Sequence, residues 1–236
     1  MKKSRKSREE WKIYKNVFDN FTLHTLNLLS SKHYFDELLS PVMIGKEANV
    51  FSASSKAGTI IAKIYRLESC NFNKMYEYIS QDIRFIGLKK QRRKIIFKWV
   101  EREFKNLAKA SAVINAPKPI AFLNNVLLME MIGSPALQLK DYSPVTKKLF
   151  NAVISQMKLL YSSGLVHADL SEFNILIHNK IPFFIDFSQA TTTDSPNAAA
   201  LLERDIKNIL RFFEKKSIAV PPAEAIIKKI NRIIKK

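Results

Sequence analysis

The chain of 236 residues has one cysteine, five glycines and no long apolar run. The lone Cys70 excludes an internal disulfide and favours a reducing compartment. No stretch approaches the roughly 18 to 20 apolar residues that span a membrane, and the basic N-terminus lacks the apolar core of a secretory signal. We therefore expect a cytoplasmic protein with no membrane partner. The positive charge of the protein could also direct it to the nucleus.

Acidic residues are scarce relative to basic ones. Lys and Arg number 39 against 21 Asp and Glu, which gives a net charge of +18. The excess is densest over residues 84–109 and at both ends, in residues 1–8 and 226–236. Because phosphate contacts from Lys and Arg bind nucleic acid independently of its sequence, RNA is the expected partner. Solvated surface charge is one alternative, and a C-terminal helix lying on an anionic membrane is another.

The order of the apolar patterns predicts an α+β fold of two lobes. Residues 1–40 are expected to form a basic helical extension ending at Pro41. Residues 41–131 are expected to form a strand-rich N-lobe with one main helix and a flexible, irregular basic insert at about 68–93. Residues 132–236 are expected to form a helical C-lobe with a small hairpin and a basic last helix. Turn residues divide the strands, and Gly133-Ser134-Pro135 marks the joint between the lobes.

Individual elements follow from periodicity. Helices are expected over 95–111, 144–163 and 197–216, with Gly164 after the second. Hairpin strands are expected over 49–54 with 59–65, over the two halves of 121–131 around Asn124-Asn125, and over 174–177 with 181–187.

Two charged residues stand where the pattern expects apolar ones. Lys63 lies in the strand TIIAKIY, both of whose faces are apolar, so its ammonium is expected near the interior. Glu103 lies within the apolar stripe of the helix IIFKWVEREFKNLAKA, while Glu101 and Arg102 are expected to point away from it. An ion pair between Lys63 and Glu103 would compensate both. The alternative is a lysine that extends to solvent and a glutamate at the margin of the stripe.

The stretch LVHADLSEFNILI contains a pattern of polar residues that carries chemistry. His167, Asp169 and Asn174 fit the H-x-D-L-x-x-x-N form of a protein-kinase catalytic loop. Asp169 can orient an acceptor and take its proton, and Asn174 can offer a neutral oxygen to a metal ion. Asp186 follows within the apolar segment FFIDF, where a cation such as Mg²⁺ would offset its charge. His167 is interpreted as a packing and hydrogen-bonding residue.

Parts of an ordinary protein kinase are missing. No G-x-G-x-x-G precedes Lys63; instead Gly45-Lys46-Glu47 could turn close to a phosphate. The position of the DFG motif reads Asp186-Phe187-Ser188, no A-P-E follows, and only 48 residues (236 − 188) remain. We expect a trimmed kinase-like fold without a full activation segment or a peptide-docking subdomain.

Several segments together resemble the RIO family of atypical serine/threonine protein kinases, type 1 branch. These segments are GKEANVF, AKIY, WVEREFKNL, LLMEMIG, LVHADLSEFNIL, and IDFSQA followed by LLERDIKNI. The resemblance implies an ATPase or kinase that uses ATP and Mg²⁺, with Mn²⁺ as an alternative metal, and acts in late maturation of the small ribosomal subunit. It implies a pre-ribosomal particle as partner and does not identify a protein substrate.

The resemblance also implies residue roles. Lys63 would contact the α- and β-phosphates, Glu103 would hold Lys63, and Asp169 would be the catalytic aspartate. Asn174 and Asp186 would bind metal, and Asp186 could accept phosphate as an aspartyl-phosphate. The adenine and phosphate contacts would come from the hinge and the glycine turn, namely from Met129, Glu130, Ile132, Gly45, Lys46 and Glu47.

Two departures from the family pattern bear on activity. Met43-Ile44 stand where the family has Ser-Thr, which removes hydroxyl donors from the phosphate loop, and Ser195-Pro196 replace a His-Pro pair. Two other functions share part of the pattern. One is a small-molecule phosphotransferase of the aminoglycoside or choline kinase type, for which little chain remains. The other is a nucleotide-gated RNA or pre-ribosome binding module with negligible turnover.

Overall fold

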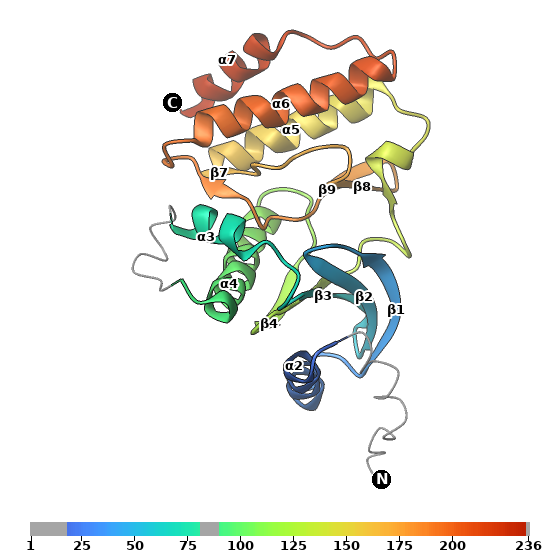
Figure 1. Cartoon of the computed structure of the whole chain (residues 1–236). Helices are drawn as coiled ribbons and strands as arrows, with labels where there is room; N and C mark the ends of the chain where they lie inside the picture. Colours follow the sequence, from blue (N-terminus) through green and yellow to red (C-terminus); the bar gives the residue numbers. More distant parts are fainter. Residues whose placement is uncertain (1–17, 81–89, 235–236) are drawn as a thin grey trace.

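The structure, a computed structural model, describes residues 18–80 and 90–234 and places them in two lobes (Figure 1). The N-lobe contains α2 (Asn20–Ser31), β1 (Glu37–Ile44), β2 (Ala48–Ser55), β3 (Gly58–Tyr65), α3 (Phe72–Ser80), α4 (Arg92–Ser111), β4 (Pro119–Leu123) and β5 (Val126–Glu130). The C-lobe contains β6 (Leu137–Gln138), a 3₁₀ turn (Leu139–Asp141), α5 (Lys147–Ser162), β7 (Leu165–Val166), β8 (Ile175–His178), β9 (Ile181–Phe184), β10 (Thr191–Thr192), α6 (Ala198–Lys215) and α7 (Ala223–Ile234).

A five-stranded antiparallel sheet, in the order β1-β2-β3-β5-β4, forms the N-lobe. Its central strand β3 is covered on both faces, as the sequence predicts. Ala62 and Ile64 pack into a core that includes α2, whereas Tyr65 and Leu127 pack into the core that includes α4. Side chains that point to the α4 face, Lys63 among them, therefore lie between the sheet and a helix.

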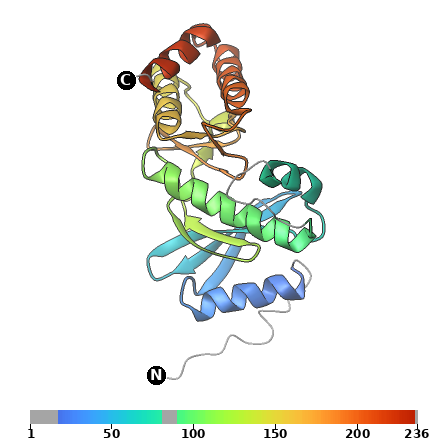
Figure 2. The ribbon, with the colours of Figure 1, turned by 90° about the vertical axis from the view of Figure 1, so that its left-hand side faces the viewer.

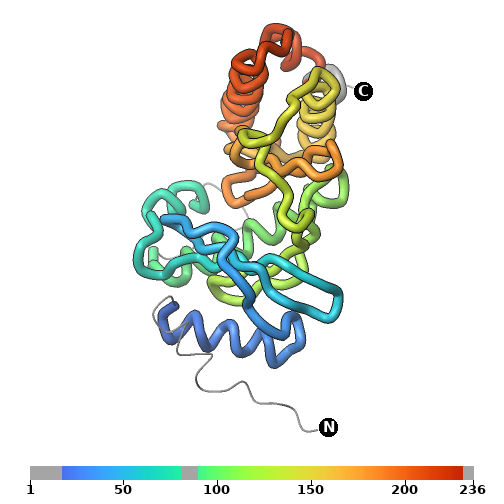
Figure 3. The backbone as a smooth tube through the Cα atoms, turned by 90° about the vertical axis from the view of Figure 1, so that its right-hand side faces the viewer, coloured from blue at the N-terminus to red at the C-terminus, as the bar shows by residue number. Residues whose placement is uncertain are grey.

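Helix α4 lies between the sheet and the C-lobe (Figure 2). The two lobes are joined by the segment after β5, which the backbone trace follows from the sheet into the helical lobe (Figure 3). Gly133 adopts φ +67 in this segment, a conformation that suits glycine. The predicted two-lobed α+β fold is confirmed.

Helix ends are shifted by up to three residues from the sequence prediction, and three larger departures stand beside these shifts. Strand β1 begins at Glu37 and continues through Pro41, which is tolerated because β1 is an edge strand and one missing N–H costs little there. The segment interpreted as irregular contains α3, whose Met75 and Ile79 lie four residues apart and are both buried. Strand β9 ends at Phe184, so the segment FFIDF is not wholly a strand. Residues 1–17 and 81–89 of the expected basic extension and insert lie outside the described residues.

Candidate active site

Lys63 is the centre of the site. Its Nζ lies 2.7 Å from Oε1 of Glu103 and 2.9 Å from Oδ1 of Asp186, and the residue is only 8% exposed. Tyr65, two residues further along β3, donates its hydroxyl to the other carboxylate oxygen of Glu103 at 2.5 Å. The ion pair predicted between β3 and α4 is therefore present. Burial disfavours the ammonium, but the two carboxylates outweigh it and raise the pKa of Lys63 well above its usual value.

Asp186 lies just beyond β9, in the left-handed backbone region with φ +63. This corrects its predicted place inside a strand. The side chain is 37% exposed rather than enclosed, so solvent and Lys63 together compensate its charge. Burial raises the pKa of Asp186, but the adjacent Lys63 ammonium outweighs this and lowers it to about 2. Asp186 is thus an ionised, partly accessible carboxylate at neutral pH.

The catalytic-loop residues converge on the same place. Asn174 donates its amide to the backbone oxygen of Asp169 at 2.8 Å and more weakly to Oδ2 of Asp169 at 3.4 Å. The backbone oxygen of Asn174 accepts from the N–H of Ile185 at 3.0 Å, which brings Asn174 beside Asp186. Burial and the negative charge of Asp186 both raise the pKa of Asp169. A carboxylate with a raised pKa is better suited to accept a proton.

His167 is a packing residue, as predicted. It is 2% exposed, its Nε2 lies 3.0 Å from the oxygen of Ile185, and its ring centroid lies 4.8 Å from that of Phe187. Burial lowers the pKa of His167 to about 4, which keeps the imidazole neutral. The neutral ring donates to Ile185 and so ties the start of the catalytic loop to the residue before Asp186.

Asp205 on α6 supports the catalytic loop and was missed at the level of sequence. Its two carboxylate oxygens accept from the N–H groups of Ala168 at 2.8 Å and Leu170 at 2.9 Å, on either side of Asp169. Arg204 donates to the oxygen of Ala168. Burial raises the pKa of Asp205 to about 7, although the hydrogen bonds from the two N–H groups lower it. Ala168 has φ +64, which is unfavourable for alanine, and these contacts stabilise that conformation.

Two residues of α4 contact the segment that follows Asp186, and neither was predicted to do so. Arg102 was expected to point away from the apolar stripe, yet it is 1% exposed and donates to the oxygen of Ser188 at 2.8 Å. Asn106 is fully buried and donates to the oxygens of Phe187 at 3.1 Å and Ala190 at 2.8 Å. A helix between two lobes buries more than one face, so a single apolar stripe underestimates its contacts.

The predicted nucleotide-contacting residues border the strand that carries Lys63. Gly45, Lys46 and Glu47 form the turn between β1 and β2, and a Cβ on Gly45 would lie 2.8 Å from the oxygen of Ala48. This close approach explains the glycine. In the hinge strand β5, Met129 pairs with Ile61 and lies on the same face of the sheet as Lys63, because Ile61 precedes Lys63 by two residues.

Two further predicted adenine contacts lie at and just after the end of β5. The N–H of Glu130 donates to the oxygen of Lys118 at 2.8 Å, and the oxygen of Ile132 accepts from Ala136 at 3.1 Å. The side chains of Met43 and Ile44, which replace the hydroxyl residues of the family pattern, are 47% and 61% exposed. Neither side chain offers a donor to a phosphate.

The donor set near Asp186 suits a hard cation. Asn174 commits its amide nitrogen to Asp169, which turns its oxygen the other way, and Asp186 supplies carboxylate oxygens. Mg²⁺ prefers such oxygen ligands and takes the rest of its shell from water and phosphate. Within 18–80 and 90–234, no group of three or more His, Cys, Asp or Glu side chains is arranged to hold a metal unaided. Asn174 and Asp186 fit a Mg²⁺ site that takes its remaining ligands from water and phosphate.

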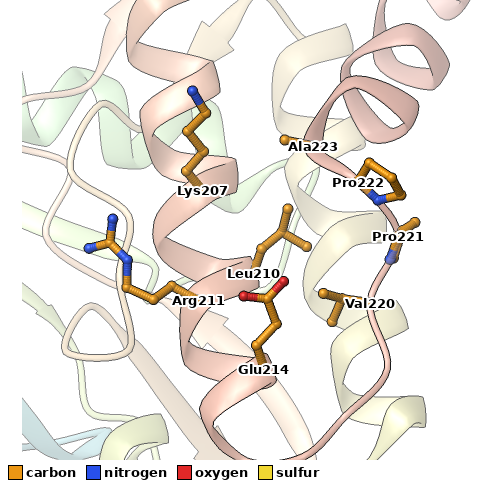
Figure 4. A pocket seen from close by; sticks show the side chains of 8 residues that line it. All are labelled: Lys207, Leu210, Arg211, Glu214, Val220, Pro221, Pro222 and Ala223. Carbon is orange, nitrogen blue, oxygen red and sulfur yellow. The ribbon is translucent and has the colours of Figure 1, made fainter.

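A surface groove of about 460 Å³ lies elsewhere, in the C-lobe. Figure 4 shows it between α6 and the start of α7, with Lys207, Arg211 and Glu214 along one side. None of the candidate active-site residues lines it.

Among the helices that the structure describes, none is both long and apolar enough to cross a membrane.

Comparisons with known proteins agree with this geometry. The family model described as "RIO domain" matches residues 49–226. The chain is 45% identical over 224 residues to the RIO-type serine/threonine-protein kinase Rio1 of Methanocaldococcus jannaschii, covering 92% of this chain and 77% of that protein. It is 36% identical over 215 residues to the human serine/threonine-protein kinase RIO1, covering 86% of this chain and 38% of that protein.

A similar solved structure is the Rio2 kinase of Chaetomium thermophilum in its ADP/Mg²⁺-phosphoaspartate complex. The TM-score is 0.68 at 24% sequence identity, over 86% of this chain and 64% of that chain. This likeness establishes a shared fold.

The fold and the site define a member of the protein-kinase class. The features that define it are the two lobes, the buried Lys63–Glu103 pair and the loop from His167 to Asn174. Within that class, the chain belongs to the RIO family and is an atypical serine/threonine protein kinase of the Rio1 type. This assignment favours the kinase over the small-molecule phosphotransferase.

Proposed function

We propose that the chain is an ATP- and Mg²⁺-dependent kinase and ATPase that acts on small-subunit precursors of the ribosome. The observation that carries the nucleotide site is Lys63, whose ammonium contacts Glu103 and Asp186 at once. Such a cation can bind α- and β-phosphates while Glu103 keeps it in place. Mg²⁺ held by Asn174 and Asp186 would neutralise phosphate charge, and Mn²⁺ could replace it.

We further propose that Asp186 itself accepts the γ-phosphoryl group. One carboxylate oxygen of Asp186 would form a bond to the γ-phosphorus as the bond to the β–γ bridging oxygen breaks, which releases ADP. Lys63 supports this role because it keeps Asp186 ionised, with a pKa of about 2. Asp169 would then take a proton from the water that hydrolyses the acyl phosphate, or from a serine hydroxyl that accepts the group. The fold neighbour was crystallised as a phosphoaspartate complex, which supports the same chemistry here.

The experiment is a single-turnover reaction with γ-labelled ATP and Mg²⁺, quenched in acid. An aspartyl-phosphate predicts protein-bound label that is lost in hydroxylamine and is absent from Asp186→Asn. Label that survives hydroxylamine would place phosphate on a hydroxyl and refute the aspartyl step. Absence of both label and ADP would favour the binding module with negligible turnover.

The proposed partner is pre-ribosomal RNA, with cytoplasmic particles as the site of action. Helix α4 begins with Arg92, Arg93 and Lys94, all exposed, and has no acidic residue in its first turn. Cations at a helix N-terminus oppose the helix dipole, so their clustering is unfavourable for the isolated helix. The guanidinium groups of Arg92 and Arg93 lie 5.0 and 5.2 Å from the ring centroids of Phe72 and Phe21. This surface offers RNA both charge and aromatic rings.

A further inference from the structure

Helix α4 contacts the segment after Asp186 through a specific set of hydrogen bonds. Arg102 and Asn106 are four residues apart and therefore project from one side of the helix, next to Glu103. They donate to three backbone oxygens of residues 187–190, at 2.8 to 3.1 Å. The same helix thus holds Lys63 through Glu103 and the Asp186 segment through Arg102 and Asn106.

The segment from Asp186 to Ala190 has few hydrogen bonds within itself. The N–H of Ala190 donates to the backbone oxygen of Phe187 at 3.2 Å, and the N–H of Ser188 donates to Oδ1 of Asp186 at 3.4 Å. Both are long hydrogen bonds. Asp186 also adopts a left-handed backbone conformation, with φ +63, which costs free energy in a non-glycine residue.

We propose that Arg102 and Asn106 are positioning residues that fix the backbone of residues 187–190 and so hold Asp186 against Lys63 before any nucleotide binds. In this arrangement α4 and the Asp186 segment move as one unit. The metal-binding carboxylate is then already in place when the nucleotide arrives. The consequence for metal binding rests on the proposed function, whereas the consequence for the backbone does not.

The test compares Asn106→Ala with a matched control, Asn125→Ala. Asn125 is also fully buried and donates to two acceptors, Thr22 Oγ1 at 2.9 Å and the oxygen of Tyr65 at 2.8 Å. Both variants remove a buried amide with two hydrogen bonds, so both are expected to unfold at lower denaturant concentration. If Asn106→Ala does not fold, Arg102→Lys tests the same segment with charge and bulk retained.

The first readout is amide hydrogen exchange of the nucleotide-free protein. Exchange at Ser188 and Ala190 is expected to accelerate in Asn106→Ala and to stay at the wild-type rate, corrected for stability, in Asn125→Ala. The second readout is binding of a fluorescent ADP with and without Mg²⁺. In Asn106→Ala, the Mg²⁺-dependent gain in ADP affinity is expected to fall about tenfold, which corresponds to about 1.4 kcal/mol. The affinity for ADP without Mg²⁺ is expected to stay the same.

Two results would overturn the positioning role and leave the proposed function intact. One is an equal exchange rate at Ser188 and Ala190 in the two variants. The other is an equal Mg²⁺-dependent gain in ADP affinity in the two variants. A wild-type protein that binds no nucleotide would refute the proposed function instead. In that case hydrogen exchange alone decides the role of Arg102 and Asn106.

Discussion

Replacing Lys63 with methionine tests the ion pair at the centre of the site. The substitution leaves Glu103, which is 1% exposed, with Tyr65 as its hydrogen-bond donor. If Glu103 stays ionised, breaking a buried pair costs about 3 to 5 kcal/mol. If Glu103 instead takes a proton, the cost is about 1.4 kcal/mol for each pH unit above its ordinary pKa of 4.5. The second route costs about 4 kcal/mol at about pH 7.5 and about 1.4 kcal/mol at about pH 5.5.

Burial already raises the pKa of Glu103 in the wild type, so part of this cost is present there as well. The loss of unfolding free energy in Lys63→Met should therefore shrink by up to about 2 to 3 kcal/mol as the pH falls from about 7.5 to about 5.5. The sign follows because acid supplies the proton that neutralises Glu103. Asp186 adds little, since its side chain is 37% exposed and can be hydrated. Urea denaturation of wild type and variant at both pH values measures the difference.

A control comes from the double variant Lys63→Met with Glu103→Gln. Glutamine cannot ionise, so this variant should regain stability relative to Lys63→Met at the higher pH and lose the pH dependence. A loss that is equal at both pH values, or a double variant that keeps the pH dependence, would refute the buried ion pair as the source of the effect.

Three other predictions concern the catalytic loop and the basic surface. Asp169→Asn should slow the step after phosphorylation of Asp186, namely hydrolysis of the acyl phosphate or transfer to serine, by about 10²- to 10⁴-fold. Nucleotide affinity should be retained, and loss of binding instead would contradict a catalytic role. The neutral form of His167 is favoured in the fold because its pKa falls from 6.5 to about 4. Stability from His167 is therefore present above about pH 6.5 and lost as the pH falls through about 4, so the stability difference between wild type and His167→Gln should shrink by up to about 3 kcal/mol on acidification. Replacing Arg92, Arg93 and Lys94 with Gln should weaken RNA binding and reduce the slope of log K against log[salt] by about 0.7 for each lost single-strand phosphate contact; an unchanged slope would place the RNA elsewhere.

Much of the site was predictable because its residues violate the apolar pattern around them. Lys63 and Glu103 each stood out in a strand or helix that was otherwise apolar on that face, and the structure pairs them at 2.7 Å. Asp205 shows the same signal, since it lies beside Leu202 and Ile206 on the buried side of α6. A carboxylate among these apolar residues indicates a buried, hydrogen-bonded side chain.

Other features depend on tertiary contacts that no local pattern contains. Arg102 looked like a solvent-facing residue because its burial comes from the C-lobe, which packs on a second face of α4. The displacement of Asp186 beyond β9 rests on a positive φ at a residue that usually avoids one. Helix α3, by contrast, carries a local signal, since Phe72, Met75, Tyr76 and Ile79 stand at i, i+3, i+4 and i+7 and pack on one core.

A crystal structure of the chain with ADP and Mg²⁺ tests the central claim most directly. The account predicts a metal ion bound by the side-chain oxygens of Asn174 and Asp186, with Lys63 on the phosphates and still paired with Glu103. A metal bound away from Asn174 and Asp186, or phosphates out of reach of Lys63, would contradict it.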